Sequence, residues 1–442
     1  MPANSLVIRR GRVVDPVQNL DAHLDVVVRD GIIETLLPAY DGEGLPVIDA
    51  HEHVVAPGFI DLHVHLRVPG QEHKETIATG SAAAAAGGFT TICCMPNTDP
   101  PLDNVGELAT LKERIAAEAV VRVFPVATIS RGRHGDEPVD YEALAAAGAV
   151  GFSDDGDSTW NSLTMRKALE ASRALGLPVM VHCEDKALAA GAMHEGTVSR
   201  SLGIEGIPPE AEEIIIVRDL MLARLTGGWL HVQHVSTARG IESIRAAKLD
   251  GVKVTAEVMP HHLAMSDGWI AGDRTLLNVD EPVGPKAEPA DPATKVNPPL
   301  RPPGDTRALL AALQRGDFDV IATDHAPHAS NEKARGFRTA PMGMSGLEFA
   351  LPLCLALVRA GHLSITDVIY RLATSPGKLL AKGFGTLMPG SPADVTIFDP
   401  NRTWVVDPDE LKTKSHNTPL LGMTLRGRTT TTMIAGVIQL ER

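Results

Sequence analysis

The middle of the chain repeats one unit eight times: a short apolar run that ends in polar residues, followed by a stretch rich in Ala and Leu. Continuous apolar strands that alternate with helices indicate parallel strands buried on both faces. Eight such units close into a (β/α)₈ barrel, an α/β fold whose chemistry lies at the C-terminal ends of the strands. The expected strand regions are Val55–Arg67, Gly88–Thr98, Val120–Ser130, Ala147–Gly156, Pro178–Glu184, Trp229–Thr237, Val252–His262 and Asp319–His328.

Both ends of the chain differ from this middle part. Short stretches of alternating hydrophobicity precede residue 55 and return after Gly385, which is typical of antiparallel strands. We therefore predict a small β-sandwich built from residues 1–54 and 386–442, beside a TIM barrel of residues 55–385. Eight prolines lie between Glu281 and Gly304, and we expect a long ordered loop there, between the seventh and eighth barrel strands.

Charge and composition exclude several classes of protein. The net charge is −14 with no run of Lys or Arg, which argues against a nucleic-acid partner because such binding needs a basic face. No window of 18 apolar residues predicts a membrane span, and Met1–Leu6 has no signal-peptide core. The four cysteines form no disulfide framework, so we expect a cytoplasmic protein.

Side chains that bind metals stand at the ends of the expected strands. His63 and His65 are two residues apart on the first strand and therefore point the same way. His182 ends the fifth strand, His234 the sixth and Asp324 the eighth. A lone His-x-His pair is a weak signal, but this coincidence at barrel strand ends meets the geometric test for a site. Imidazole and carboxylate suit Zn²⁺, which lowers the pKa of bound water to about 7, and we predict one or two zinc ions.

Two metal ions held together would need a bridging anion between them. The fourth strand offers two carboxylates, Asp154 and Asp155. Because neighbours in a strand point to opposite sides, only one of them should reach the metals, and the residues alone leave the choice open. By the same alternation, Cys183 is expected to face away from the barrel lumen when His182 faces into it.

Several motifs resemble those of the dihydroorotases, a family of the amidohydrolase superfamily. Asp61–Arg67, with the sequence DLHVHLR, resembles the first signature of that family. Ala322–His328, with the sequence ATDHAPH and followed by Lys333, resembles the second. Further matches follow in barrel order at Gly87–Thr91, Met95–Thr98, Val181–Glu184, His234–Thr237, Pro260–His262 and Asn297–Arg301.

The resemblance implies a bridge and a complete ligand set. In the long bacterial type of dihydroorotase, the second Asp of a Thr-Asp-Asp-Gly segment bridges the metals, which corresponds to Asp155. Hydantoinases and another dihydroorotase type use a carboxylated Lys instead, and no Lys occurs near Asp155 on its strand. The implied metal ligands are His63, His65, Asp155, His182, His234 and Asp324.

The resemblance also implies the substrate contacts. Dihydroorotate carries one carboxylate, for which Arg67 offers a forked donor, while Asn97 and Asn297 offer amides to the ring. The chain departs from the family at Val68, where Glu is usual, and at Met342, where Phe is common. The implied contacts are His65, Arg67, Asn97, Asn297, His328, Met342 and Gly343.

The implied reaction is the reversible, zinc-dependent hydrolysis of dihydroorotate to N-carbamoyl-L-aspartate in de novo pyrimidine biosynthesis. Asp324 would carry the proton in both directions, and the polar segment Ala329–Pro341 is a candidate lid. One alternative is a hydantoinase or an allantoinase. Another is an inactive, dihydroorotase-like structural partner of aspartate carbamoyltransferase, which the complete set of ligand positions disfavours. We also expect a homo-oligomer.

Overall fold

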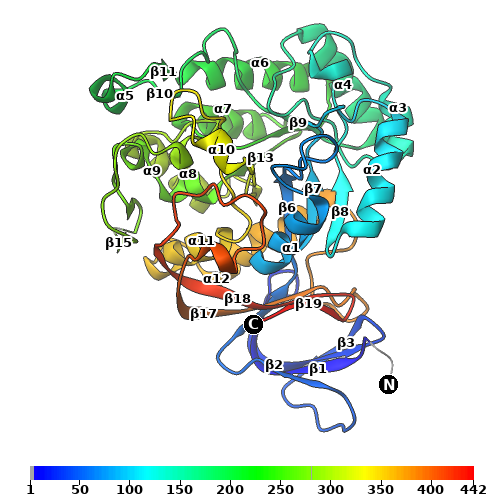
Figure 1. Cartoon of the computed structure of the whole chain (residues 1–442). Helices are drawn as coiled ribbons and strands as arrows, with labels where there is room; N and C mark the ends of the chain where they lie inside the picture. The colour runs from blue at the N-terminus through cyan, green and yellow to red at the C-terminus, as the bar shows by residue number, and fades with distance from the viewer. Residues whose placement is uncertain (1–3, 280) are drawn as a thin grey trace.

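The barrel wall is built from short parallel strands that close into a ring (Figure 1). The computed structural model describes residues 4–279 and 281–442. Phe152 pairs with Ala127 and Val179, which joins a three-stranded and a four-stranded sheet, and Val64 pairs with His325 to complete the ring. The predicted barrel is confirmed, with its fourth strand reduced to the bridges at Phe152. The named strands are β6 (Phe59–Val64), β7 (Phe89–Cys94), β8 (Arg122–Pro125), β9 (Val179–Val181), β12 (Leu230–Val232), β13 (Val254–Val258) and β16 (Val320–Ile321).

Helices surround this ring, as Figure 1 shows. Their ends follow local capping chemistry: Asn161 accepts a hydrogen bond from the Leu163 amide to start α4, and Gly176, with φ 71°, ends it. The longer helices are α1 (Ile77–Gly87), α2 (Val105–Glu118), α4 (Ser162–Leu175), α6 (Glu210–Thr226), α7 (Ala238–Leu249), α9 (Pro303–Arg315) and α11 (Ala350–Arg359). The shorter ones are α3 (Tyr141–Ala146), α5 (Thr197–Leu202), α8 (Pro260–Ala264), α10 (Ser330–Lys333), α12 (Ile365–Ile369) and α13 (Ser375–Leu380).

Strands from both chain ends form one continuous eight-stranded sheet in the order β19-β18-β17-β5-β1-β2-β3, with β4 beside β1. The sheet folds back on itself, and its two layers enclose a core that includes Ile8, Val28 and Ile397 (Figure 1). The predicted sandwich is thus a single folded sheet. Its strands are β1 (Leu6–Asp15), β2 (Leu20–Arg29), β3 (Ile32–Leu37), β4 (Val47–Asp49), β5 (Val54–Pro57), β17 (Val395–Val405), β18 (Thr424–Ile434) and β19 (Val437–Glu441).

The expected strand Val55–Arg67 is in fact two strands that belong to different sheets. β5 pairs with β1 and with β17 in the terminal sheet, whereas β6 starts the barrel at Phe59. Pro57 ends β5 and Gly58 separates it from β6, and both residues weaken strand continuity. How the chain divides into domains stays a prediction, and Met1–Ala3 of the predicted sandwich lie outside the described residues.

The barrel interior is apolar at its base and polar at its mouth. Ile60, Leu62, Met95, Met180 and Val320 form a buried cluster inside the ring. The main core lies between the strands and the helices, and Cys183 belongs to it, facing away from the lumen as expected. All four cysteines are buried and free. Over the described residues, no helix has the length and hydrophobicity that crossing a membrane requires.

The proline-rich segment is a loop that leads back to the barrel mouth. It begins in a short hairpin of β14 (Thr275–Leu276) and β15 (Glu281–Pro282), and another two-stranded pair, β10 (Met193–His194) with β11 (Gly206–Ile207), lies in the loop after β9. Arg301 anchors the far end, because its guanidinium donates to Ser236 and to Glu212 of α6. These buried contacts fix the end of the loop above the site.

Candidate active site and metal centre

A cavity of about 340 Å³ opens at the C-terminal ends of the barrel strands. His63 lies beneath its surface and is fully buried. The structure therefore brings all the predicted site residues together at the barrel mouth. The predicted residues that line the cavity are His65, Arg67, Asn97, Asp155, His182, His234, Asn297, Asp324, His328, Met342 and Gly343.

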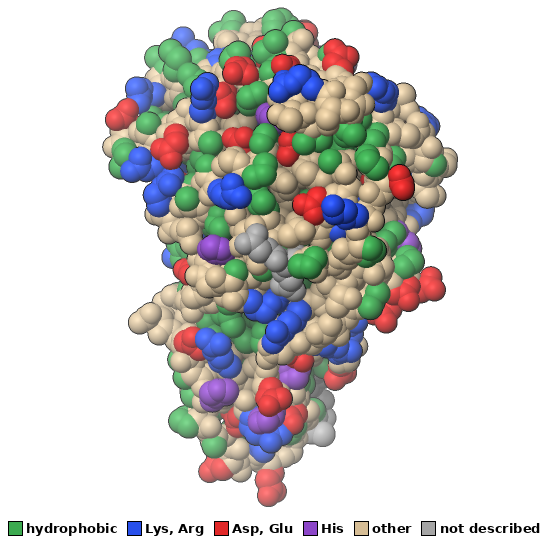
Figure 2. Space-filling model, turned by 90° about the vertical axis from the view of Figure 1, so that its left-hand side faces the viewer, with side chains coloured by type: hydrophobic (Ala, Val, Ile, Leu, Met, Phe, Trp, Pro, Cys, Tyr) green, Lys and Arg blue, Asp and Glu red, His purple; other side chains and the backbone are tan. Residues whose placement is uncertain are grey.

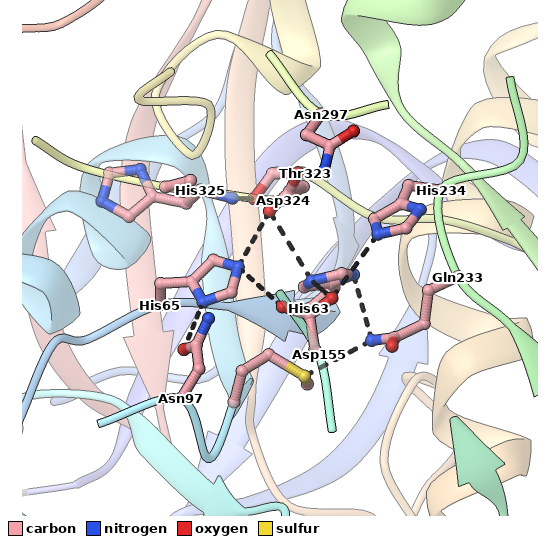
Figure 3. Close-up of polar contacts among 12 residues, drawn as sticks. His63, His65, Asn97, Asp155, Gln233, His234, Asn297, Thr323, Asp324 and His325 are labelled. Carbon is pink, nitrogen blue, oxygen red and sulfur yellow. Dashed lines mark hydrogen bonds and ion pairs between the residues drawn. The ribbon is translucent and has the colours of Figure 1, made fainter. Parts of the chain in front are cut away.

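Asp155 lies at the centre of four imidazoles (Figure 3 shows three of them with Asp155). Its Oδ1 is 3.4 Å from His63 Nε2 and 3.5 Å from both His182 Nδ1 and His234 Nε2. Its Oδ2 is 3.3 Å from His65 Nε2. Burial raises the pKa of Asp155, but the charge of His63 and the close contacts with His182 and His234 outweigh this effect and hold the pKa well below its ordinary value. Asp155 is therefore an ionised carboxylate that both sides of the site share.

Asp154 points away from the cavity and has a different set of partners. Its carboxylate accepts hydrogen bonds from the amides of Ile129 and Ser130 and from the hydroxyls of Ser130 and Thr159. The alternation along the fourth strand thus sends one carboxylate to the site and the other into the barrel wall, where it fixes the loop after β8.

His63, on β6, and His65, just after β6, are each oriented by a second side chain. His63 Nδ1 donates to Glu257 Oε1 at 2.6 Å, and His65 Nδ1 donates to Asn97 Oδ1 at 2.8 Å. Each bond fixes the ring so that Nε2 faces Asp155. Holding a ligating imidazole by its other nitrogen is the usual arrangement around protein-bound metals.

The donor atoms of the site fit a metal ion. His63, His65 and Asp155 form one group of close ligand atoms, and Asp155, His182 and His234 form a second. His63 Nε2 and Asp155 Oδ1 are buried without a hydrogen-bond partner, a costly state that a cation would relieve. Burial lowers the pKa of His182, yet the nearby carboxylates of Asp155 and Glu184 raise it to about 10. The surroundings thus favour positive charge.

Asp324 lies beside the first group. Its Oδ1 is 3.0 Å from His65 Nε2 and 3.6 Å from His63 Nε2 (Figure 3). Asp324, His234 and Arg67 all have positive φ, at 47°, 33° and 61°, a conformation that costs non-glycine residues about 1–3 kcal/mol. The backbone is therefore strained at these three residues, each of which follows a strand. The surrounding packing holds it in this conformation.

One wall of the cavity carries donors for an anion. The Arg67 guanidinium is buried, and its Nε donates to the Pro327 carbonyl. Burial lowers its pKa to about 10, so the group stays charged at neutral pH. Within the described chain no carboxylate forms an ion pair with Arg67. His328 contacts both Arg67 and the Met342 carbonyl through Nε2. Its imidazole therefore lies between Arg67 and Met342.

Four further residues that the motifs do not indicate belong to the site. Glu257, on β13, bonds to His63, to the His234 amide and to His231. Its signal in the sequence is a carboxylate within the apolar run VTAEV. Gln233 contacts His63, and Gln71 and Arg133 line the cavity. Gln71 lies on a loop and Arg133 in the single 3₁₀ turn Arg131–Arg133, where no periodicity marks them.

Arg133 adds a second guanidinium to the wall. Its Nη2 pairs with Asp157 and its Nε is buried without a partner. Burial also lowers the pKa of Arg133, against the attraction of Asp155. The positive charges of Arg67 and Arg133 repel each other across the cavity, so a bound anion would relieve the repulsion.

Comparisons with known proteins agree with this geometry. Residues 52–240 match the family model described as Dihydro-orotase-like. The chain is 45% identical over 98% of its length to a dihydroorotase of Anaeromyxobacter dehalogenans, of which 97% is covered. It is 44% identical over 96% of its length to that of Aquifex aeolicus, with 96% covered. Among solved structures, an L-hydantoinase (dihydropyrimidinase) from Arthrobacter aurescens superimposes with a TM-score of 0.85 at 25% identity, covering 99% of this chain and 96% of the other.

Fold, site and structural relatives together define a class, the cyclic amidohydrolases built on a (β/α)₈ barrel with a β-sandwich. Sequence identity of 44–45% to dihydroorotases over nearly the whole chain narrows this class to one family. The chain belongs to the dihydroorotase family.

Proposed function

We propose that this chain catalyses the reversible hydrolysis of dihydroorotate to N-carbamoyl-L-aspartate, as a zinc enzyme of pyrimidine biosynthesis. The observation that carries the proposal is one carboxylate, Asp155, within 3.5 Å of four imidazole nitrogens, beside a buried Arg67 that has no carboxylate partner in the described chain. The cluster of ligand atoms around Asp155 supports metal-dependent hydrolysis, and the unpaired guanidinium of Arg67 supports binding of a ring that carries a carboxylate.

The proposed metal ligands are the six side chains at the cavity floor. His63, His65 and Asp324 would hold one ion, His182 and His234 a second, and Asp155 would serve both. Bound zinc polarises a carbonyl oxygen and lowers the pKa of water to about 7.

Asp324 is the proposed proton carrier. Burial raises the pKa of Asp324, but the charge of His63 and the hydrogen bond from His65 lower it more, so the carboxylate is ionised and free to accept a proton. It takes the proton of the attacking water at Oδ1 or Oδ2 and delivers it to the ring nitrogen that leaves. The reverse reaction uses the same group in the opposite order.

The wall residues bind and orient the ring. Arg67 pairs with the substrate carboxylate through a forked contact. Asn97 Oδ1 is taken by His65, which leaves its amide group for the ligand. Asn297 lies across the cavity, with Nδ2 2.8 Å from Glu184 Oε1 and 3.3 Å from His182 Nε2. Met342 and Gly343 also line the cavity.

Two other functions remain as outcomes of the test. The solved relatives include hydantoinases, and their substrates would not need Arg67. An inactive partner of aspartate carbamoyltransferase would need no metal, whereas His63 Nε2 and Asp155 Oδ1 here are buried ligand atoms without hydrogen-bond partners. Association with aspartate carbamoyltransferase stays part of the proposal, since an active enzyme can also bind one.

The test combines an assay with metal analysis. The purified protein should hold zinc and hydrolyse dihydroorotate in preference to hydantoin and allantoin. His63→Ala should lose metal and turnover together. Turnover of hydantoin above dihydroorotate would assign the chain to the other branch, and a metal-free, inactive wild-type protein would support a structural role.

A further inference from the structure

Lys333 is neither a metal ligand nor a substrate contact of the proposed site, although it follows the motif Ala322–His328. It lies in α10 and is only 7% exposed, and Lys295 of the proline-rich loop is only 5% exposed. Lysines are almost never buried unless they have partners. Figure 2 shows Lys and Arg side chains in their usual place, on the surface, over the side of the molecule where Figure 1 labels β15. The burial of these two lysines therefore indicates a specific role.

The Lys333 ammonium group joins two loops through backbone carbonyls. Its Nζ donates to the carbonyls of Pro292 and Lys295, at 3.0 and 3.2 Å, on the proline-rich loop. It also donates to the Pro341 carbonyl, at 2.9 Å, at the end of the lid segment Ala329–Pro341. An ammonium group has three donors, so all the hydrogen-bonding capacity of this side chain is spent on holding the two loops together.

Lys295 makes the same connection in the opposite direction. Its Nζ donates from the proline-rich loop to the lid carbonyls of Arg338 and Ala340, at 3.0 and 2.8 Å. Its own carbonyl accepts from Lys333 and, at 2.8 Å, from the Gly343 amide. Within the described chain, no ion pair joins either lysine to a carboxylate. Each ammonium group thus bonds to carbonyl oxygens of the other loop.

Both of the joined loops carry substrate contacts of the proposed site. Asn297 lies two residues after Lys295, and Met342 and Gly343 follow the lid segment directly. All three line the cavity. A displacement of about 1 Å at a bound substrate can reduce the rate roughly 100-fold, so the position of one loop relative to the other matters for recognition of the ring.

We propose that Lys295 and Lys333 are positioning residues that lock the lid segment to the proline-rich loop, so that Asn297 and the Met342–Gly343 pair meet the substrate in a fixed arrangement. This inference rests on the proposed function, because those three residues are its substrate contacts. Four ammonium–carbonyl contacts cross between the loops, and the two loops therefore move as one unit. Loops that are ordered in advance reduce the cost of binding.

Hydrogen exchange on the full-length protein tests this coupling independently of activity. Lys333→Met removes the ammonium group and should speed amide exchange about tenfold in residues 288–298 as well as in residues 329–343, since a hydrogen bond to a charged group is worth at least such a factor. Lys295→Met should loosen the same two segments from the other side. Lys286→Met is the matched control, because Lys286 lies on the same loop as Lys295 but is exposed. Faster exchange confined to the loop that carries the substitution would overturn the proposal.

Steady-state kinetics with dihydroorotate test the positioning role. Each Met variant should keep its metal and a kcat near the wild-type value, while KM rises about tenfold. The double variant should be no worse than the more impaired single variant, because either substitution separates the same loops and coupled residues do not act additively. An unchanged KM in both single variants, or additive effects in the double variant, would contradict a shared lock. A wild-type protein that does not turn over dihydroorotate would contradict the proposed function, and hydrogen exchange would still decide whether the loops are coupled.

Discussion

The floor and the rim of the barrel cavity are built in different ways. The floor consists of side chains at strand ends, where carboxylates and imidazoles hold one another in buried contacts. The rim, with Arg67, Asn97, Arg133 and His328, lies on the loops that follow and presents cations and amides. Strands therefore set the chemistry and loops set the recognition, as barrel enzymes generally do. Floor substitutions should change metal content and kcat, and rim substitutions should change KM and specificity.

The sharpest difference should come from two neighbouring carboxylates of the floor. Asp155→Asn should lose metal, and its activity should fall well beyond the roughly 100-fold that loss of an outer hydrogen-bond partner costs. Asp154→Asn keeps the cavity intact but disturbs the hydrogen bonds with Ser130 and Thr159, so it should lose about 1–3 kcal/mol of stability and retain metal. Metal analysis, kcat and thermal unfolding of both proteins decide. The opposite order would show that Asp154 is the residue that serves the metals.

Asp324→Asn separates proton transfer from metal binding. The amide keeps the size of the side chain but cannot accept the proton, so the rate should fall by roughly 10²–10⁴-fold while the ions remain. Rate and metal content are measured on the same sample. A variant with near wild-type activity would mean that another group carries the proton.

On the rim, Arg67→Lys keeps the charge but removes the fork. Losing a paired donor to a buried carboxylate costs on the order of 2–5 kcal/mol, and kcat/KM for dihydroorotate should fall accordingly. A neutral ring such as hydantoin should be affected far less. An equal loss on both rings would assign Arg67 to the architecture of the site instead.

Glu257→Gln tests whether the floor depends on the carboxylate beneath it. The Gln side chain keeps the shape but weakens the 2.6 Å contact that orients His63, so metal affinity or activity should fall by about 10–100-fold. Thr255→Ser, on the same strand, leaves that contact untouched and serves as the control. Unchanged zinc affinity in the Gln variant would show that β6 alone orients His63.

The smallest effect is expected at Arg133, which is only partly buried. A charge-assisted hydrogen bond contributes about 1.5–3 kcal/mol, and solvent exposure reduces it here, so Arg133→Gln should raise KM for dihydroorotate by about tenfold with little change in kcat. Steady-state kinetics measure both values. A fall in kcat with constant KM would place Arg133 among the groups that act on the floor.

Strand-end residues of the site could be predicted from sequence because two local rules combine there. Apolar runs locate the strands, and alternation tells which side chains share a face, which is how His63 and His65 are found together. Glu257 escapes these rules, because its role depends on which strands become neighbours. Arg133 escapes them because its single 3₁₀ turn is too short to show a period.

The fold, like the site, has parts that local sequence rules predict and parts that they miss. The barrel follows from the alternation of apolar strands with Ala- and Leu-rich stretches along the chain. The short strands expected after Gly385, by contrast, include two long continuous strands, β17 and β18, between which the register shifts. Bulges preserve pairing where hydrophobic alternation breaks, so the sequence pattern ends before the strand does.

The place of β5 in the terminal sheet has a consequence for how the chain is made. β5 pairs on one side with β1 and on the other with β17, which begins only at Val395. During synthesis, the N-terminal strands therefore wait for the last part of the chain, with one edge of β5 unpaired. Exposed strand edges invite association with other chains, and contacts between distant segments form slowly. A chain that ends before Val395 would contain every side chain of the proposed site but would leave that edge of β5 unpaired. Such a truncated chain should aggregate more than the complete one, so aggregation would distinguish the two.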